Sequence, residues 1–167
     1  ALHDVRDKLP LIVCRQEGGA AFMAEAYGKL TGRPGICFVT RGPGASNAAI
    51  GVHTAQQDST PMILFIGQVG GDVVERDAFQ EVDYRRMFGS IAKWVAQIDR
   101  AERIPEMISH AFHVAVSGRP GPVVLSLPED MLTTRTTAPA TERYHRVAAS
   151  PNSRDMAKLR HLLQQAR

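Results

Sequence analysis

Two cysteines, a 6% share of aromatic residues and the lack of any long apolar run limit what this 167-residue chain can be. Two thiols do not make a disulfide framework, and Cys14 and Cys37 each lie in an apolar run, where thiols are usually small buried hydrophobes. The longest apolar run is far shorter than the roughly 20 residues of a membrane-spanning helix. We therefore expect a protein of the reducing cytoplasm with no membrane partner.

The chain also lacks a strong charge of one sign. Its formal net charge is +3 with a pI near 9.1, and its cationic residues are scattered among acidic ones. No basic stripe with interleaved aromatic residues is present, so we expect no nucleic-acid partner. A composition of 44% hydrophobic and 22% charged residues is ordinary for one globular domain with a hydrophobic core.

Several common catalytic signatures are missing. The sequence contains no H-E-x-x-H, no C-x-x-C and no recognisable Ser-His-Asp set. His110 and His113 lie three residues apart on one predicted helix, but no further ligands accompany them, so we assign them structural or surface roles. We predict no metal site within the chain.

Strand and helix patterns alternate along the sequence. Apolar runs predict strands at residues 9–15, 35–40, 61–67, 93–98 and 122–127. Helical spacing with Gly or Pro at the ends predicts helices at residues 17–30, 45–57 and 103–116. This order predicts an α/β fold, a parallel sheet with helices on both faces. The irregular stretch 68–89 predicts a functional loop with a short helix.

The composition changes near residue 133. We predict one domain over residues 1–132, then a Thr-, Ala- and Pro-rich linker over 133–151. Ser153 is expected to cap a last helix, so that residues 152–167 begin a following central domain. The chain starts without Met and with a strand pattern almost at once, from which we expect an N-terminally incomplete domain that lacks its first strand and helix.

Glu17 follows the first predicted strand. Open parallel sheets bind ligands beyond the carboxyl ends of their strands, and Gly18 and Gly19 would let a ligand approach the backbone closely. An acid in the first turn of a helix is equally well explained by the helix dipole. The spacing alone leaves both interpretations of Glu17 open.

A glycine turn, Gly42-Pro43-Gly44-Ala45-Ser46-Asn47, lies at the next strand-to-helix junction. Phosphate-binding loops occupy such junctions, but Asn47 stands where the dinucleotide fingerprint G-x-G-x-x-G has its third glycine. Asn47 is suited to capping the helix or to bonding a ligand. A purely structural turn and a ligand-binding turn are both consistent with the motif.

These segments recur, in order, in a known family. They read RQEGGAA at 15–21, AEAYG at 24–28, TGRPG at 31–35, TRGPGASN at 40–47, DSTPM at 58–62, GQV at 67–69, DAFQE at 77–81 and SGRPGPV at 117–123. Over roughly residues 9–132 the chain resembles thiamine-diphosphate enzymes of the acetohydroxyacid (acetolactate) synthase group. The matching part is their N-terminal domain that holds the aminopyrimidine ring, the Pyr domain.

The resemblance implies the cofactor thiamine diphosphate and assigns residues around its pyrimidine ring. Glu17 would be the catalytic carboxylate that hydrogen-bonds the ring nitrogen opposite the exocyclic amine, and Thr40, Pro43 and Asn47 would line the same ring. A carboxyl group in an apolar cleft resists ionisation and can share a proton with a ring nitrogen. We therefore expect Glu17 in such a cleft.

The resemblance also implies a reaction and an assembly. The full-length enzyme would decarboxylate a 2-oxo acid such as pyruvate and join the product to an acceptor, with Gln80 taking part in catalysis and Phe79 and Lys93 near the substrate. Its Pyr domain would pair with the diphosphate-binding domain of a neighbouring subunit. We expect a homodimer or homotetramer.

The chain departs from the synthases near the site. Arg41 stands where they usually carry a small residue, and Gly18 where they usually carry glutamine. The stretch Ala55-Gln56-Gln57-Asp58 also differs from their usual pattern. No G-D-G followed by a distant Asn is present, so Mg²⁺ and the diphosphate are expected on a domain absent from this chain. The chain alone is then expected to be inactive. The resemblance leaves open whether FAD is bound elsewhere in the full-length protein.

Three alternatives remain. The first is a related thiamine-diphosphate decarboxylase, oxidase or acetyltransferase. The second is a dinucleotide-binding module, which would need an acidic residue at the tip of the next strand, where the chain has Gly67-Gln68-Val69. The third is a structural interaction domain, which would leave Glu17 and Asn47 unexplained.

Overall fold

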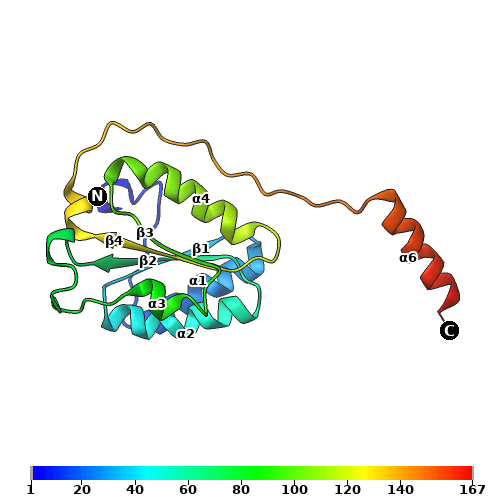
Figure 1. The fold of residues 1–167 in the computed structure, drawn as a ribbon, viewed down its shortest axis with the longest axis horizontal. Helices are drawn as coiled ribbons and strands as arrows, with labels where there is room; N and C mark the ends of the chain where they lie inside the picture. Colours follow the sequence, from blue (N-terminus) through cyan, green and yellow to red (C-terminus); the bar gives the residue numbers. More distant parts are fainter. Residues whose placement is uncertain (1, 167) are drawn as a thin grey trace.

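The computed structural model describes residues 2–166 (Figure 1). Its elements in chain order are η1 (Leu2–Val5), α1 (Glu17–Thr31), β1 (Gly35–Val39), α2 (Pro43–Gln57), β2 (Met62–Gln68), η2 (Gly71–Val73), α3 (Tyr84–Phe88), β3 (Trp94–Gln97), η3 (Ala101–Arg103), α4 (Ile104–Val116), β4 (Pro122–Pro128), α5 (Glu129–Thr133) and α6 (Ser153–Gln165). Four of the five predicted strands and the three helices predicted at residues 17–30, 45–57 and 103–116 are confirmed.

The four strands form one parallel sheet in the order β1-β2-β4-β3. Cys37 of β1 lies beside Leu64 of β2, which lies beside Val124 of β4. The two central strands, β2 and β4, are buried on both faces, which explains why they read as continuous apolar runs. The predicted parallel α/β sheet is therefore confirmed.

Helices cover both faces of the sheet. In Figure 1, α1, α2 and α3 lie on one face and α4 on the other. Each layer has its own apolar core: Leu64 and Phe88 belong to the first, Ile63 and Leu125 to the second. Close approach in the first layer requires glycine at position 28, because a Cβ there would lie 2.2 Å from the Pro61 carbonyl oxygen.

Two predictions from the sequence are wrong: the strand at residues 9–15 and the capping residue of the last helix. Residues 9–15 form no strand; they run as irregular chain and leave Cys14 half-buried. A strand exists only where its backbone groups pair with a neighbour, and this segment pairs with none of the strands described here. The last helix is capped by Asn152, whose side chain accepts a hydrogen bond from the Asp155 amide, so Ser153 is its first residue.

The C-terminal part leaves the domain. After α5 the chain passes along α4, where Tyr144 stacks on Phe112, and then extends to α6, which stands away from the sheet (Figure 1). No residue of α6 is buried. The division into domains stays a prediction. Among the described helices, none combines the length and apolarity needed to cross a membrane.

Candidate functional site

Glu17 is the first residue of α1, and its position follows from the cap that precedes it. Gln16 has extended backbone angles, and its side-chain oxygen accepts a hydrogen bond of 2.8 Å from the Gly19 amide. This cap turns the chain sharply into the helix. The Glu17 carboxylate thus projects at the carboxyl edge of the sheet, beside the turn that follows β1.

Asn47 meets Glu17 across the two helices. Its Nδ2 donates a hydrogen bond of 3.0 Å to Glu17 Oε2, so the first turns of α1 and α2 are joined by these two side chains. The hydrogen bond from Asn47, followed by one from the backbone of Glu17 itself, lowers the pKa of this carboxyl against the opposing effect of burial.

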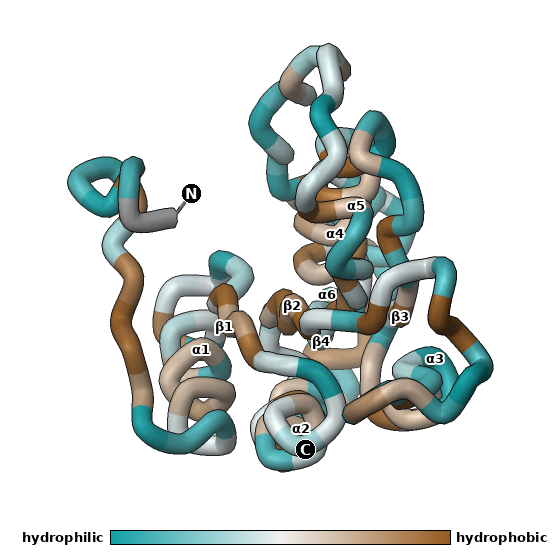
Figure 2. The backbone as a smooth tube through the Cα atoms, turned by 90° about the vertical axis from the view of Figure 1, so that its left-hand side faces the viewer, coloured by the Kyte–Doolittle hydropathy of each residue, from teal (hydrophilic) through white to brown (hydrophobic). Residues whose placement is uncertain are grey.

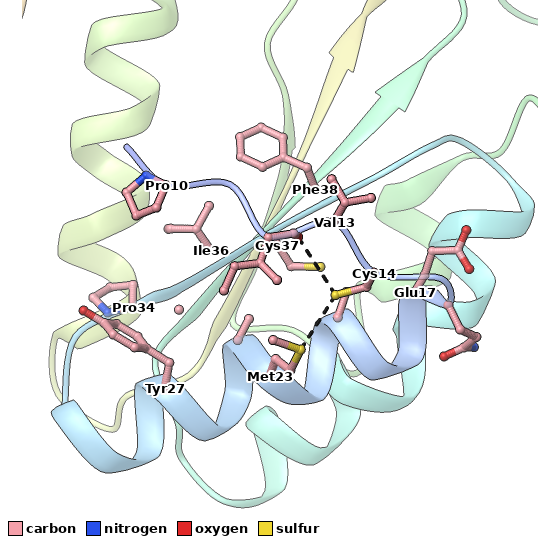
Figure 3. Close-up of a pocket in the computed structure, with 15 residues that line it drawn as sticks. Pro10, Val13, Cys14, Glu17, Met23, Tyr27, Pro34, Ile36, Cys37 and Phe38 are labelled. Atoms are coloured by element: carbon pink, nitrogen blue, oxygen red, sulfur yellow. Dashed lines mark hydrogen bonds between the residues drawn. The ribbon is translucent and has the colours of Figure 1, made fainter. Parts of the chain in front are cut away.

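The environment of Glu17 differs from the apolar cleft expected from the sequence. The residue is half-buried, and its carboxylate lies at the end of an apolar cavity rather than inside it (Figure 3). Its pKa is lowered, not raised. The physical reason is that a donated amide hydrogen bond stabilises the charged form while the surrounding space remains accessible to water.

The glycine turn after β1 packs closely against Glu17. Gly42 has a φ of 34°, in the region that favours glycine, and Pro43 occupies the first helical turn of α2. A Cβ at Gly44 would lie 2.9 Å from Thr40 Cγ2 and 3.5 Å from Glu17 Oε1. Glycine at this position therefore lets the turn pack closely against Thr40 and the carboxylate.

Tyr84 anchors the glycine turn through hydrogen bonds. The sequence did not indicate this role. Its hydroxyl accepts a hydrogen bond of 2.9 Å from the Gly42 amide and donates one of 3.4 Å to the Gly67 carbonyl. Burial raises the pKa of the Tyr84 hydroxyl. In the sequence this tyrosine is one apolar residue of a short helix, and no local signal distinguishes it from a core residue.

The loop that contains Phe79 and Gln80 packs against the same turn. A Cβ at Gly42 would lie 3.0 Å from the Gln80 carbonyl oxygen, so the two backbones are in contact. Phe79 is 79% exposed. Three non-glycine residues in this loop have positive φ, at 62° for Glu75, 53° for Asp77 and 64° for Gln80. Such strained backbone is concentrated at functional sites in proteins.

One carboxylate organises this loop. Glu81 accepts hydrogen bonds of 2.7 Å from the Glu75 amide and 3.1 Å from the Ala78 amide. These bonds fix the backbone on either side of Asp77 and hold the strained residues in place.

Lys93 lies at the amino ends of the strands, opposite the end of the sheet that carries Glu17. It precedes β3, and its amide donates to the Pro122 carbonyl at the start of β4, whereas Glu17 and Gln80 lie beyond the strands' carboxyl ends. Its Nζ donates to the carbonyls of Val114 and Ser117 at the end of α4. The structure therefore does not bring Lys93 together with the other predicted site residues within this chain, and its role stays a prediction.

Two of the departures from the synthase pattern, Arg41 and Gly18, have structural explanations. Arg41 is partly buried and lies 3.6 Å from the Glu129 carboxylate, at the carboxyl ends of β1 and β4. At Gly18, a Cβ would lie 2.9 Å from Gln16 Oε1, so the capping side chain fills the space that a larger residue would need.

These residues suit an aminopyrimidine ring. Thr40, Pro43 and Asn47 are exposed around the half-buried residue Glu17, and the missing Cβ of Gly44 lets the glycine turn approach Thr40 and Glu17 closely. A carboxylate and an amide supply the acceptor and donor groups that a ring with a basic nitrogen and an exocyclic amine requires. Within residues 2–166, no three His, Cys, Asp or Glu side chains gather in a way that would hold a metal ion.

Comparison with known proteins decides the family. Residues 1–87, just over half of the chain, match the family described as thiamine pyrophosphate enzyme, N-terminal TPP binding domain. The chain belongs to this family. Glu17, the glycine turn and the Phe79–Gln80 loop all lie within the matching part of this TPP-enzyme domain.

Similar curated proteins include acetolactate synthases of yeast, bacteria and archaea. The chain is 39% identical to the mitochondrial acetolactate synthase catalytic subunit of Saccharomyces cerevisiae over 148 residues, which cover 84% of the chain and 21% of the yeast protein. It is 43% identical to the acetolactate synthase large subunit of Lactococcus lactis over 137 residues, 82% of the chain and 24% of that protein. It is also 43% identical to the probable large subunit of Methanococcus aeolicus over 131 residues, 78% of the chain and 22% of that protein.

The chain therefore spans about a fifth to a quarter of the length of these relatives. It is a TPP-binding N-terminal domain of acetolactate synthase-like proteins. This family membership replaces the dinucleotide-binding alternative. The structure agrees: a dinucleotide-binding module would need an acidic residue at the end of β2, and β2 ends at Gln68.

Proposed function

We propose that this TPP-enzyme domain holds the aminopyrimidine ring of thiamine diphosphate and that Glu17 exchanges a proton with that ring. The observation that supports this most directly is the 3.0 Å hydrogen bond from Asn47 Nδ2 to Glu17 Oε2 beside the glycine turn, where Gly44 packs closely against the carboxylate. Both side chains come from positions that match the family's motif.

Glu17 would act by holding a hydrogen at the ring nitrogen. When bound, thiamine diphosphate supplies a nucleophilic carbon that attacks a 2-oxo acid and accepts the electron pair released on decarboxylation. The Glu17 carboxylate must then exist in two protonation states near neutral pH. Closure of the site by other parts of the protein would remove water from Glu17 and raise its pKa, because desolvation disfavours the charged form.

Asn47, Thr40 and Pro43 would orient the ring. Asn47 keeps one carboxylate oxygen of Glu17 in place through the 3.0 Å hydrogen bond, which leaves its partner oxygen directed at the ring. Thr40 and Pro43 lie on the glycine turn beside Glu17. Their role is to position the ring, since neither side chain titrates in the physiological range.

The substrate side of the site would be the strained loop. Gln80 lies against Gly42 and would contact the reacting 2-oxo acid, and the exposed Phe79 would cover it. Pyruvate with a second 2-oxo acid as acceptor is the substrate pair that the acetolactate synthase relatives suggest. A related decarboxylase, oxidase or acetyltransferase would use the same site with another acceptor.

The activity would belong to a longer polypeptide. A second domain, from a neighbouring subunit of a homodimer or homotetramer, would bind Mg²⁺ and the diphosphate, and Lys93 would reach substrate in that assembly. FAD is a further cofactor that the longer polypeptide could bind. The cytoplasm is the proposed location, since both cysteines are free thiols.

A direct test is to incubate the longer polypeptide with pyruvate and follow its consumption. The proposal predicts turnover that requires both thiamine diphosphate and Mg²⁺ and is lost on treatment with a chelator. Formation of acetolactate identifies a synthase, whereas acetaldehyde or acetyl phosphate identifies a related branch. No consumption of any 2-oxo acid by the loaded protein would contradict the proposal.

A further inference from the structure

One cation lies among acids at the carboxyl ends of the neighbouring strands β1, β2 and β4. The residues that directly follow these strands, at 40–42, 69–73 and 129–134, include Asp72, Glu129 and Asp130, and their only lysine or arginine is Arg41. Figure 2 looks onto this end of the sheet and shows a hydrophilic segment where β1 passes into α2. Within these segments, Arg41 is the side chain with the charge to bind a carboxylate.

Arg41 stands between the two parts of the proposed site. Thr40, which precedes it, is proposed to position the pyrimidine ring, and Gly42, which follows it, contacts the backbone of Gln80. Burial raises the pKa of the Tyr84 hydroxyl, and the nearby positive charge of Arg41 opposes that shift. The charge of Arg41 therefore acts where the glycine turn meets the substrate loop.

The Arg41 guanidinium is available to a ligand. Within residues 2–166 its ion-pair partner is Glu129, and the two side chains are 29% and 71% exposed. The 3.6 Å between Arg41 Nη2 and Glu129 Oε2 is longer than a hydrogen bond of about 2.7–3.2 Å. Exposed ion pairs are weak, whereas a guanidinium can bind a carboxylate through two parallel hydrogen bonds. A carboxylate ligand can therefore displace Glu129.

The chemistry distinguishes between the two substrates. The donor 2-oxo acid loses its carboxylate as carbon dioxide, so a cation that binds this group tightly stabilises the ground state and slows the reaction. In carboligation a carbon–carbon bond forms at the carbonyl carbon of the acceptor, and the carbonyl oxygen takes up a proton. The carboxylate of the acceptor is unchanged throughout. Arg41 therefore suits the acceptor rather than the donor.

We propose that Arg41 binds the carboxylate of the acceptor and so selects a second 2-oxo acid over an uncharged aldehyde. Glu129 holds the guanidinium at the ends of β1 and β4 until the acceptor displaces it. This inference rests on the proposed function for the reaction, but not for the position of the charge. It gives a role in substrate choice to a residue at which the chain departs from the synthase pattern.

Competition between two acceptors tests the proposal in the longer polypeptide loaded with thiamine diphosphate and Mg²⁺. Pyruvate is the donor, and the acceptors are 2-oxobutanoate and propanal, in which a hydrogen replaces the carboxylate. Mass spectrometry measures the ratio of the two carboligation products, 2-aceto-2-hydroxybutanoate and 3-hydroxypentan-2-one. Arg41→Gln should lower this ratio about 10–100-fold, since hydrogen bonds to a charged group are lost. Arg41→Lys, which keeps the charge, should restore part of it.

Arg103→Gln is the matched control. Arg103 is also a partly exposed, ion-paired arginine, but its partner is Glu106 on α4. This variant should give the wild-type product ratio. A ratio measured within one reaction does not depend on the amount of folded enzyme, so a merely structural role of Arg41 would leave it unchanged. A wild-type ratio in Arg41→Gln would overturn the proposal.

Chemical modification of the same loaded protein gives a readout that needs no turnover. Phenylglyoxal reacts with accessible guanidinium groups, and peptide mapping measures the modification of Arg41 and Arg103. Lactate carries the carboxylate of an acceptor without a carbonyl that can react, and lactamide is its neutral counterpart. Lactate should slow the modification of Arg41 several-fold and lactamide should not, whereas Arg103 should respond to neither.

The modification also separates this inference from the proposed function. Equal modification of Arg41 in lactate and in lactamide would overturn the inference, whatever the turnover. If the wild-type protein consumes no pyruvate although lactate protects Arg41, the proposed function fails and the carboxylate site stands.

Discussion

Asn47 Nδ2 donates a 3.0 Å hydrogen bond to Glu17 Oε2 and so joins two helices whose residues are 30 positions apart in the sequence. The bond favours the charged carboxylate and lowers the pKa of Glu17. The same contact therefore places the carboxylate and sets its charge. Anything that removes water from Glu17 works against the hydrogen bond and moves the pKa upward.

Replacing Asn47 with Ala should raise the pKa of Glu17 toward its ordinary value, as measured by NMR titration of labelled glutamate carboxyls in the 167-residue chain. Because the folded-state pKa is lowered, the contribution of Asn47 to stability is present above the unfolded pKa and is lost as pH falls through the folded pKa. The difference in free energy of unfolding between the variant and the wild type should shrink over that acidic range.

Asn152→Ala is the control for this titration, because Asn152 caps α6 and lies far from Glu17 (Figure 1). It should leave the pKa of Glu17 unchanged. An equal pKa of Glu17 in Asn47→Ala and wild type would show that the hydrogen bond does not set its charge.

Gly28→Ala should lower the free energy of unfolding by about 1–3 kcal/mol, since its Cβ would lie 2.2 Å from the Pro61 carbonyl oxygen and α1 would have to move off β2. Urea denaturation measures the change. Gly19→Ala in the same helix is the matched control: the nearest atom to its Cβ would be 3.9 Å away, so the substitution should stabilise by about 0.5–1 kcal/mol. Equal effects at the two positions would refute the packing argument.

Tyr84→Phe should destabilise the domain by about 1–3 kcal/mol, because the buried Gly42 amide would lose its acceptor. It should also weaken binding of thiamine diphosphate to the longer polypeptide, since the glycine turn is no longer held. Tyr144→Phe is the comparison. This linker tyrosine stacks on Phe112 of α4, and the change in the free energy of unfolding should stay within about 0.5 kcal/mol. Unaltered stability and cofactor affinity in Tyr84→Phe would show that Tyr84 does not hold the glycine turn.

Most of the sheet and its helices could be predicted because apolar periodicity is a local property. β2 and β4 read as continuous apolar runs, and α4 shows a clear apolar stripe. Residues 9–15 show the limit of this reasoning: the same apolar pattern forms no strand here, because pairing requires a neighbour that the pattern cannot supply.

The site was predictable only in part. Glu17 and Asn47 could be selected from the order of their motifs, but periodicity alone does not bring together residues on two different helices. Tyr84 could not be selected from the sequence, because its role depends on a hydrogen bond between its hydroxyl and a backbone amide 42 positions away. The lowered pKa of Glu17 also could not be foreseen, since it depends on one side-chain hydrogen bond and on the accessible space around it.

The central claim is that Glu17 exchanges a proton with the cofactor ring, and Glu17→Gln tests it in the longer polypeptide. The amide keeps the size and the acceptor oxygen of Glu17 but cannot transfer a proton. NMR measures hydrogen–deuterium exchange at the reactive thiazolium carbon of bound thiamine diphosphate. Glu106→Gln, a surface change on α4, is the control and should exchange like wild type. We predict exchange slower by on the order of 10²–10⁴ in Glu17→Gln; exchange at the wild-type rate would contradict the account.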